Sequence, residues 1–107
     1  MPLTRDYKET LLERAQQDPA FAQALLDEAI GLFLNGDPVT ARIVLRDLVN
    51  ATMGFEDLAQ QTEKTSKSLH RMLSDRGNPT MDNLAKIFTA LRQALNVDIV
   101  VHVETAA

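Results

Sequence analysis

The sequence lacks cysteine and tryptophan, and aromatic residues make up only 5% of its 107 residues. Without cysteine the chain can form no disulfide, no thiolate metal site and no cysteine nucleophile. Its two histidines, His70 and His102, are isolated, so we expect no metal site and no cofactor. With so few aromatic residues, the core must be built from aliphatic side chains.

Long apolar runs are also missing. No stretch approaches the roughly 18 apolar residues that a membrane-spanning helix needs. Residues 1–6 lack the apolar run of a signal peptide. We therefore expect a cytoplasmic protein that does not enter a membrane.

Patterns that indicate catalysis are absent as well. Asp27-Glu28 and Glu56-Asp57 are adjacent carboxylates, but neighbours on a helix point in different directions. There is no glycine-rich phosphate loop, and no histidine is placed to activate a serine. We expect no enzymatic activity.

The length fits a single domain, residues 1–107, and 45% hydrophobic residues suffice for one modest core. The net charge of −4 is unevenly distributed. Residues 1–63 hold eleven acidic residues against five basic ones, whereas residues 64–76 hold four basic residues and one acidic residue. An acidic body with one basic segment is typical of a local nucleic-acid-binding surface, although a solvated helix face can show the same bias.

Six helices are expected. Asp18-Pro19 and Asp37-Pro38 each combine a good N-cap with a proline at the first helical position. The helices should cover 4–16, 19–35, a third segment from Pro38 to Gly54, then 55–62, 65–73 and a sixth from Thr80 to Asn96. The third helix is expected to bury an apolar stripe of Val39, Ile43, Val44, Leu48 and Val49.

The spacing of apolar residues changes from a helical pattern to an alternating one near the C-terminus. Val97, Ile99, Val101 and Val103 alternate with other residues, a pattern that predicts a β-strand. A lone strand has unpaired edges, and the same strand of a second molecule is its simplest partner. These four residues are therefore the expected homodimer interface. The alternatives are a frayed apolar tail and pairing with another segment of the same chain.

Residues 55–73 indicate a pair of crossed helices. Leu58 and Ala59 would form the inner side of the first, and Thr65 would cap the second. The second helix would bury Leu69, Met72 and Leu73. Its outer side would carry hydroxyls and cations, the groups that reach bases and phosphates in a DNA groove: Ser66, Lys67, His70, Arg71 and Ser74.

Three segments, 58–62, 65–73 and 77–91, resemble the phage-repressor-like (Xre-type) helix-turn-helix. Together with the helix that follows Gly36, they resemble more closely the addiction-module antidote proteins, which are antitoxins of RelE/ParE-like toxins. The resemblance covers roughly residues 20–95. It departs from the family at the turn, where Glu63 stands in place of the usual glycine and would have to adopt a positive φ, unless the turn has another shape.

The resemblance implies an all-α, lambda-repressor-like bundle, which we expect to end in the C-terminal strand. Its parts would be N-terminal helices (1–52), a helix-turn-helix core (53–95) and a C-terminal strand and tail (96–107). It also implies a transcriptional repressor that binds operator DNA, represses its own operon and neutralises a toxin; the C-terminal strand adds the expectation of a homodimer. The DNA-binding residues carried over are Thr65, Ser66, Lys67, His70, Arg71, Asn78 and Thr80. The alternatives are a free-standing regulator without a toxin, and a protein-interaction module that does not bind DNA.

Overall fold

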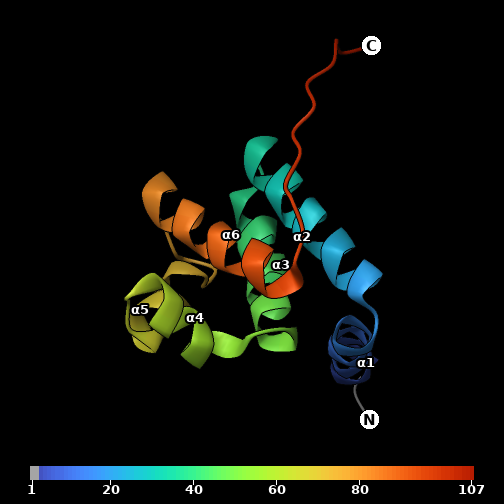
Figure 1. Ribbon diagram of the computed structural model, residues 1–107. Coiled ribbons are helices and arrows are strands. Elements are labelled where there is room, and N and C mark those ends of the chain that lie inside the picture. Colours follow the sequence, from blue (N-terminus) through green and yellow to red (C-terminus); the bar gives the residue numbers. More distant parts are fainter. Residues whose placement is uncertain (1–2) are drawn as a thin grey trace.

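The computed structural model describes residues 3–107, which form six helices (Figure 1). In chain order these are α1 (Leu3–Gln17), α2 (Pro19–Leu34), α3 (Pro38–Ala51), α4 (Gly54–Thr62), α5 (Ser66–Met72) and α6 (Met81–Leu95). The expectation of an all-helical body is confirmed. The third helix ends at Ala51, three residues before the glycine that was expected to stop it.

The predicted helix starts are formed by side-chain caps. Asp18 and Asp37 accept hydrogen bonds from first-turn N–H groups of α2 and α3, at 3.1 and 3.2 Å. Thr65 and Thr80 cap α5 and α6 in the same way, each at 3.1 Å. Gly36 follows α2 with a φ of +88°, the left-handed conformation expected for a glycine at this position.

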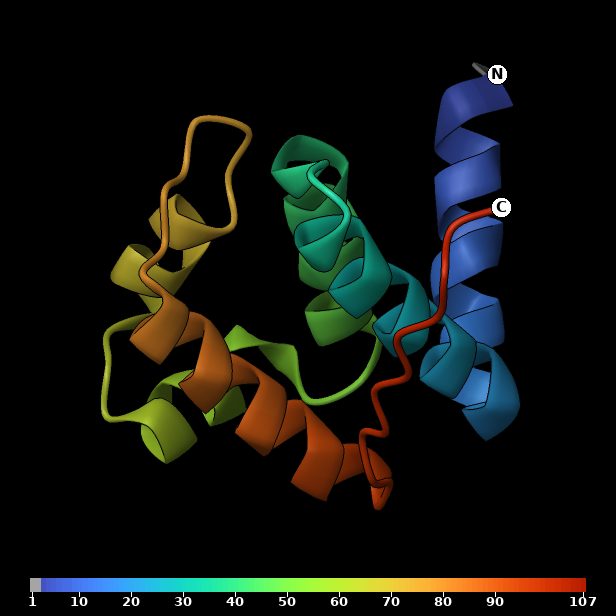
Figure 2. The same cartoon turned by 90° about the horizontal axis from the view of Figure 1, so that it is seen from above.

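The helices are arranged around the pair α2 and α3, which pack against each other. Helix α6 contacts α2 and α4, and α1 lies against α2 and α3 at one edge of the molecule. Both views place α4 and α5 at the opposite edge from α1 (Figures 1 and 2).

One apolar cluster connects α2 through to α6, so the segments on either side of residue 53 share a single core. Leu58, Leu69 and Leu73 are fully buried in it, as the spacing in residues 55–73 predicted. The buried members of the cluster are Ala22, Leu26, Ala29, Leu45, Leu48, Val49, Phe55, Leu58, Leu69, Leu73, Leu84, Ile87, Ala90 and Leu91.

The expected apolar face of α3 is partly wrong. Val39 and Ile43 are 48% and 38% exposed, whereas Ala41 and Leu45 are fully buried. The buried side is rotated because α3 contacts α1, α2 and α4, so several directions around it are covered. A single helical stripe cannot describe a helix that is packed on more than one side.

The predicted C-terminal β-strand is not present: residues 97–107 contain no strand, and no strand occurs among residues 3–107. The Val97 N–H bonds the Arg92 carbonyl at 3.0 Å, after which the chain runs away from α6 as a single extended segment (Figure 1). The prediction was wrong because alternation of apolar residues alone does not establish a strand, which also needs a neighbouring strand to pair with.

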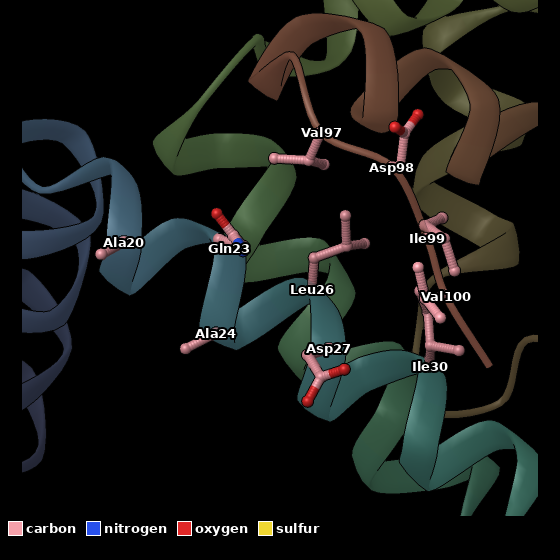
Figure 3. Close-up of a pocket in the computed structure, with 10 residues that line it drawn as sticks. All are labelled: Ala20, Gln23, Ala24, Leu26, Asp27, Ile30, Val97, Asp98, Ile99 and Val100. Carbon is pink, nitrogen blue, oxygen red and sulfur yellow. The ribbon is translucent and has the colours of Figure 1, made fainter. Parts of the chain in front are cut away.

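A groove separates this segment from α2 (Figure 3). Leu26 and Ile30 line its α2 side, and Val97 and Ile99 line the other. Val97 is half-buried and packs against the protein's own core. Contact with the core and the groove beside α2 thus accounts for Val97 and part of Ile99, whereas Val101 and Val103 remain exposed.

Candidate nucleic-acid interface

Helices α4 and α5 are joined by a tight turn, residues 63–65. Glu63 adopts the left-handed conformation, with φ 57° and ψ 37°, as its position in place of a glycine predicted. The next amide, Lys64 N–H, donates to the Ala59 carbonyl at 3.1 Å and closes the end of α4. Glutamate in place of the glycine usual at this position therefore leaves the turn intact.

Thr65 connects the turn to α5 through two hydrogen bonds. Its hydroxyl oxygen accepts from the Ser68 N–H at 3.1 Å, and the Ser68 hydroxyl donates to the Thr65 carbonyl at 3.0 Å. The first bond engages the Thr65 hydroxyl and the second engages its backbone carbonyl, so both fix the start of α5. Ser66, the first residue of α5, is half-buried.

The exposed side of α5 carries Lys67, His70 and Arg71. Lys67 and Arg71 are exposed, as is Arg76 in the following loop. Within the described part of the chain, none of these three cations pairs with a carboxylate or donates a side-chain hydrogen bond. Their charge is therefore available to an anionic partner.

His70 differs from its neighbours because its ring is already engaged. It stacks on the ring of Phe55 in α4, with ring centroids 3.8 Å apart and an interplanar angle of 19°. The exposed imidazole covers a phenylalanine that is itself 6% exposed. A contact with DNA would use the outer edge or face of this stacked ring.

The loop between α5 and α6 is attached to α3. The Arg42 guanidinium donates from Nε to the Ser74 carbonyl at 2.8 Å and from Nη2 to the Asp75 carbonyl at 2.9 Å. The Ser74 carbonyl also accepts the Gly77 N–H at 3.0 Å. Arg42 is 7% exposed, so a buried cation neutralises carbonyl groups just beyond the C-terminal end of α5.

Gly77 allows the loop to lie against α5. A Cβ at this position would lie 2.1 Å from the Met72 carbonyl oxygen, so no side chain fits. Asn78 follows directly and is exposed, and Thr80 is exposed while capping α6. Figure 2 shows this loop beside α5, on the side of the molecule away from α1.

Four of the seven predicted DNA-binding residues, Ser66, Lys67, His70 and Arg71, lie on α5. Thr65 caps the start of this helix, and Asn78 and Thr80 lie in the loop region between α5 and α6. Sequence reasoning missed Arg42 and Gly77, which shape that region. Arg42 had a detectable signal, since an arginine flanked by Ala41, Ile43 and Val44 in a helix is a candidate buried cation.

The predicted dimer residues lie elsewhere, on the C-terminal segment. Val97 packs inward, Ile99 is 37% exposed, and Val101 and Val103 are 62% and 87% exposed. Their role in a dimer stays a prediction, now without the strand that was expected to carry it.

Among the residues whose side chains the structure describes (9, 10 and 12–107), there is no cluster of three or more His, Cys, Asp or Glu that could hold a metal ion. Over residues 3–107, no helix has the length and apolar character needed to cross a membrane. Comparison of the chain with known protein families, with characterised proteins and with solved structures finds no significant match.

Proposed function

We propose that this chain is a sequence-specific DNA-binding transcriptional repressor, acting in the cytoplasm, in which α4 and α5 form a helix-turn-helix. The observation that carries the proposal is the exposed side of α5, where Lys67 and Arg71 are unpaired on a helix fixed by the Thr65 cap and the Leu69 anchor. Positioned cations on a short helix with buried support match the chemistry of a DNA backbone and groove.

In the proposed complex α5 enters the major groove. Lys67 and Arg71 contact phosphates or base edges, and Ser66 and His70 lie on the flank of the same helix. Asn78 and Thr80 contact the phosphate backbone from the loop. A homodimer would place two copies of α5 in successive major grooves, about 34 Å apart on a palindromic site.

The direct test is a mobility shift of the purified protein with the DNA upstream of its own coding sequence, using random duplex as competitor. Specific retention should fall steeply with salt, by about 10³-fold between about 50 and 200 mM if six phosphates are contacted. Absence of binding at the lower salt concentration would contradict the proposal.

A second function is favoured by a separate observation. The N-terminal part of the chain is strongly acidic, and the C-terminal segment exposes Val100, Val101 and Val103. Together with the resemblance to antidote proteins, this supports an antitoxin that binds a basic RelE/ParE-like toxin through charge and apolar contacts.

Co-expression with the product of a short adjacent reading frame tests this second function. Co-purification of the two proteins, and relief of growth inhibition caused by the neighbour, would support it. A chain with no such neighbour would instead be a free-standing regulator. Stable association with a protein and no DNA binding at any salt concentration would indicate an interaction module.

A further inference from the structure

We infer that Arg42, on a helix outside the proposed DNA-binding surface, is the positioning residue that holds the α5–α6 loop in its DNA-binding conformation. The inference rests on the DNA-binding role proposed above and identifies the part of the core that controls it. Arg42 itself contacts no nucleic acid in this scheme.

One guanidinium makes two hydrogen bonds to the loop. Arg42 is anchored in α3, between the fully buried Ala41 and Leu45, and binds the Ser74 and Asp75 carbonyls at 2.8 and 2.9 Å. A planar guanidinium that makes two bonds fixes direction as well as distance. The loop is therefore oriented relative to α3, and not only to the helices it connects.

The orientation of the loop also sets the position of the residues expected to contact DNA. The Ser74 carbonyl, held by Arg42, also accepts the Gly77 N–H at 3.0 Å. Gly77 lies against the Met72 carbonyl, where no side chain fits. Asn78 is the next residue, so its backbone position follows from a chain of contacts that begins at Arg42.

An ordered loop should raise the affinity for DNA. A loop held in place before DNA arrives loses little conformational freedom on binding, which increases affinity. Without Arg42, the Ser74 and Asp75 carbonyls would lose their side-chain partner and the loop could sample other conformations. Contacts from Asn78 and Thr80 would weaken, while Lys67 and Arg71 on α5 would remain in place.

The test uses Arg42→Gln, with Arg42→Lys as the conservative variant. Arg46→Gln is the matched control, since it removes a half-buried arginine from the next turn of α3. Hydrogen exchange of the Gly77 amide reports the loop in the free protein. Arg42→Gln should accelerate this exchange and leave the fully buried parts of α4 and α6 protected. Arg46→Gln should leave it unchanged.

DNA affinity supplies the readout that a merely structural role would not change. We expect Arg42→Gln to weaken operator binding by about tenfold at a temperature where the variant is fully folded, equivalent to about 1.4 kcal/mol. We expect Arg42→Lys to restore part of the affinity. Asn78→Ala should weaken binding in the wild type and have almost no further effect in Arg42→Gln, whereas Lys67→Ala should weaken both proteins equally.

The outcomes separate this inference from the proposed function. If the wild type binds DNA but the effects of Arg42→Gln and Asn78→Ala add fully, Arg42 does not act through the loop and the inference is wrong. Unchanged Gly77 exchange in Arg42→Gln would overturn it equally. If the wild type binds no DNA, the proposed function fails and the positioning role falls with it, even where the exchange result shows that Arg42 orders the loop.

Discussion

The ring of His70 lies nearly parallel to the ring of Phe55, with centroids 3.8 Å apart, and joins the exposed side of α5 to the buried side of α4. The same imidazole is a predicted DNA-binding group. Removing it would therefore change both the stability of the helix pair and any contact with DNA, and the two effects need separate variants.

His70→Ala should lower the free energy of unfolding by about 1 kcal/mol, because stacked aromatic pairs contribute about 0.5–1.5 kcal/mol beyond their buried area. Thermal melting should show a fall of about 4–8 °C. His70→Phe keeps a stacked ring but removes the ring nitrogens, so it should retain most of the stability. A loss of DNA affinity in His70→Phe would then indicate a direct polar contact, and an equal loss of stability in both variants would contradict the stacking explanation.

Lys67→Ala combined with Arg71→Ala should abolish most DNA binding while leaving the fold unchanged, because both side chains are exposed and unpaired. If both contact phosphates, the slope of log affinity against log salt should become shallower by about 2. Circular dichroism and the unfolding midpoint should match those of the wild type. Arg14→Ala removes a cation on α1, away from α5, and is the control for affinity; because the Arg14 guanidinium lies 4.6 Å from the Phe21 ring centroid, the stability of this control is measured as well. Wild-type affinity in the double variant would exclude this surface.

Glu63→Gly should raise the free energy of unfolding by about 1 kcal/mol, because glycine adopts the observed φ of 57° without the steric cost that other residues carry. Urea denaturation should show a higher midpoint with an unchanged slope. Asn96→Gly is the matched comparison, since Asn96 has a φ of 54° and asparagine tolerates this conformation better. The gain at residue 96 should be the smaller one; an equal or larger gain there would contradict the strain assigned to Glu63.

Gly77→Ala should destabilise the protein by about 1–3 kcal/mol, because its Cβ would overlap the Met72 carbonyl and force the loop or α5 to move. Gly31→Ala is the opposite case. Apart from the adjoining residues and backbone of α2 itself, no atom lies within 4 Å of where a Gly31 Cβ would be, and alanine is favoured over glycine within a helix by about 0.5–1 kcal/mol. Chemical denaturation should therefore show a lower free energy of unfolding for Gly77→Ala and a higher one for Gly31→Ala. An unchanged free energy of unfolding in Gly77→Ala would show that the loop can move away without destabilising the protein.

The helix boundaries could be predicted because the signals that set them are local. Asp18, Asp37, Thr65 and Thr80 each bond a backbone N–H two or three residues ahead, so a few neighbouring letters contain the whole interaction. The left-handed conformation of Glu63 was one of two possibilities left open by the resemblance, in which this turn position usually holds glycine.

The features that sequence reasoning missed depend on contacts between distant residues. Arg42 bonds carbonyls 32 and 33 residues away, and no local pattern indicates which loop a buried cation will meet. The strand prediction for the C-terminal residues failed for a similar reason. Val97 and Ile99 line a groove with α2, a helix distant from them in the sequence. Local periodicity predicted a strand that the structure lacks, because a strand needs a pairing partner that periodicity does not identify.

The seven residues of α5 are too few to remain helical alone in water, and Leu69 and Leu73 attach the helix to a core that reaches back to α2. The proposed DNA-binding surface consequently has no independent stability. As denaturant or temperature rises, operator binding and the hydrogen-exchange protection of the core amides should be lost in one cooperative transition. A fragment beginning at residue 53 should remain unfolded. Any change that loosens the distant α2–α3 pair would then act on DNA binding through the population of folded molecules.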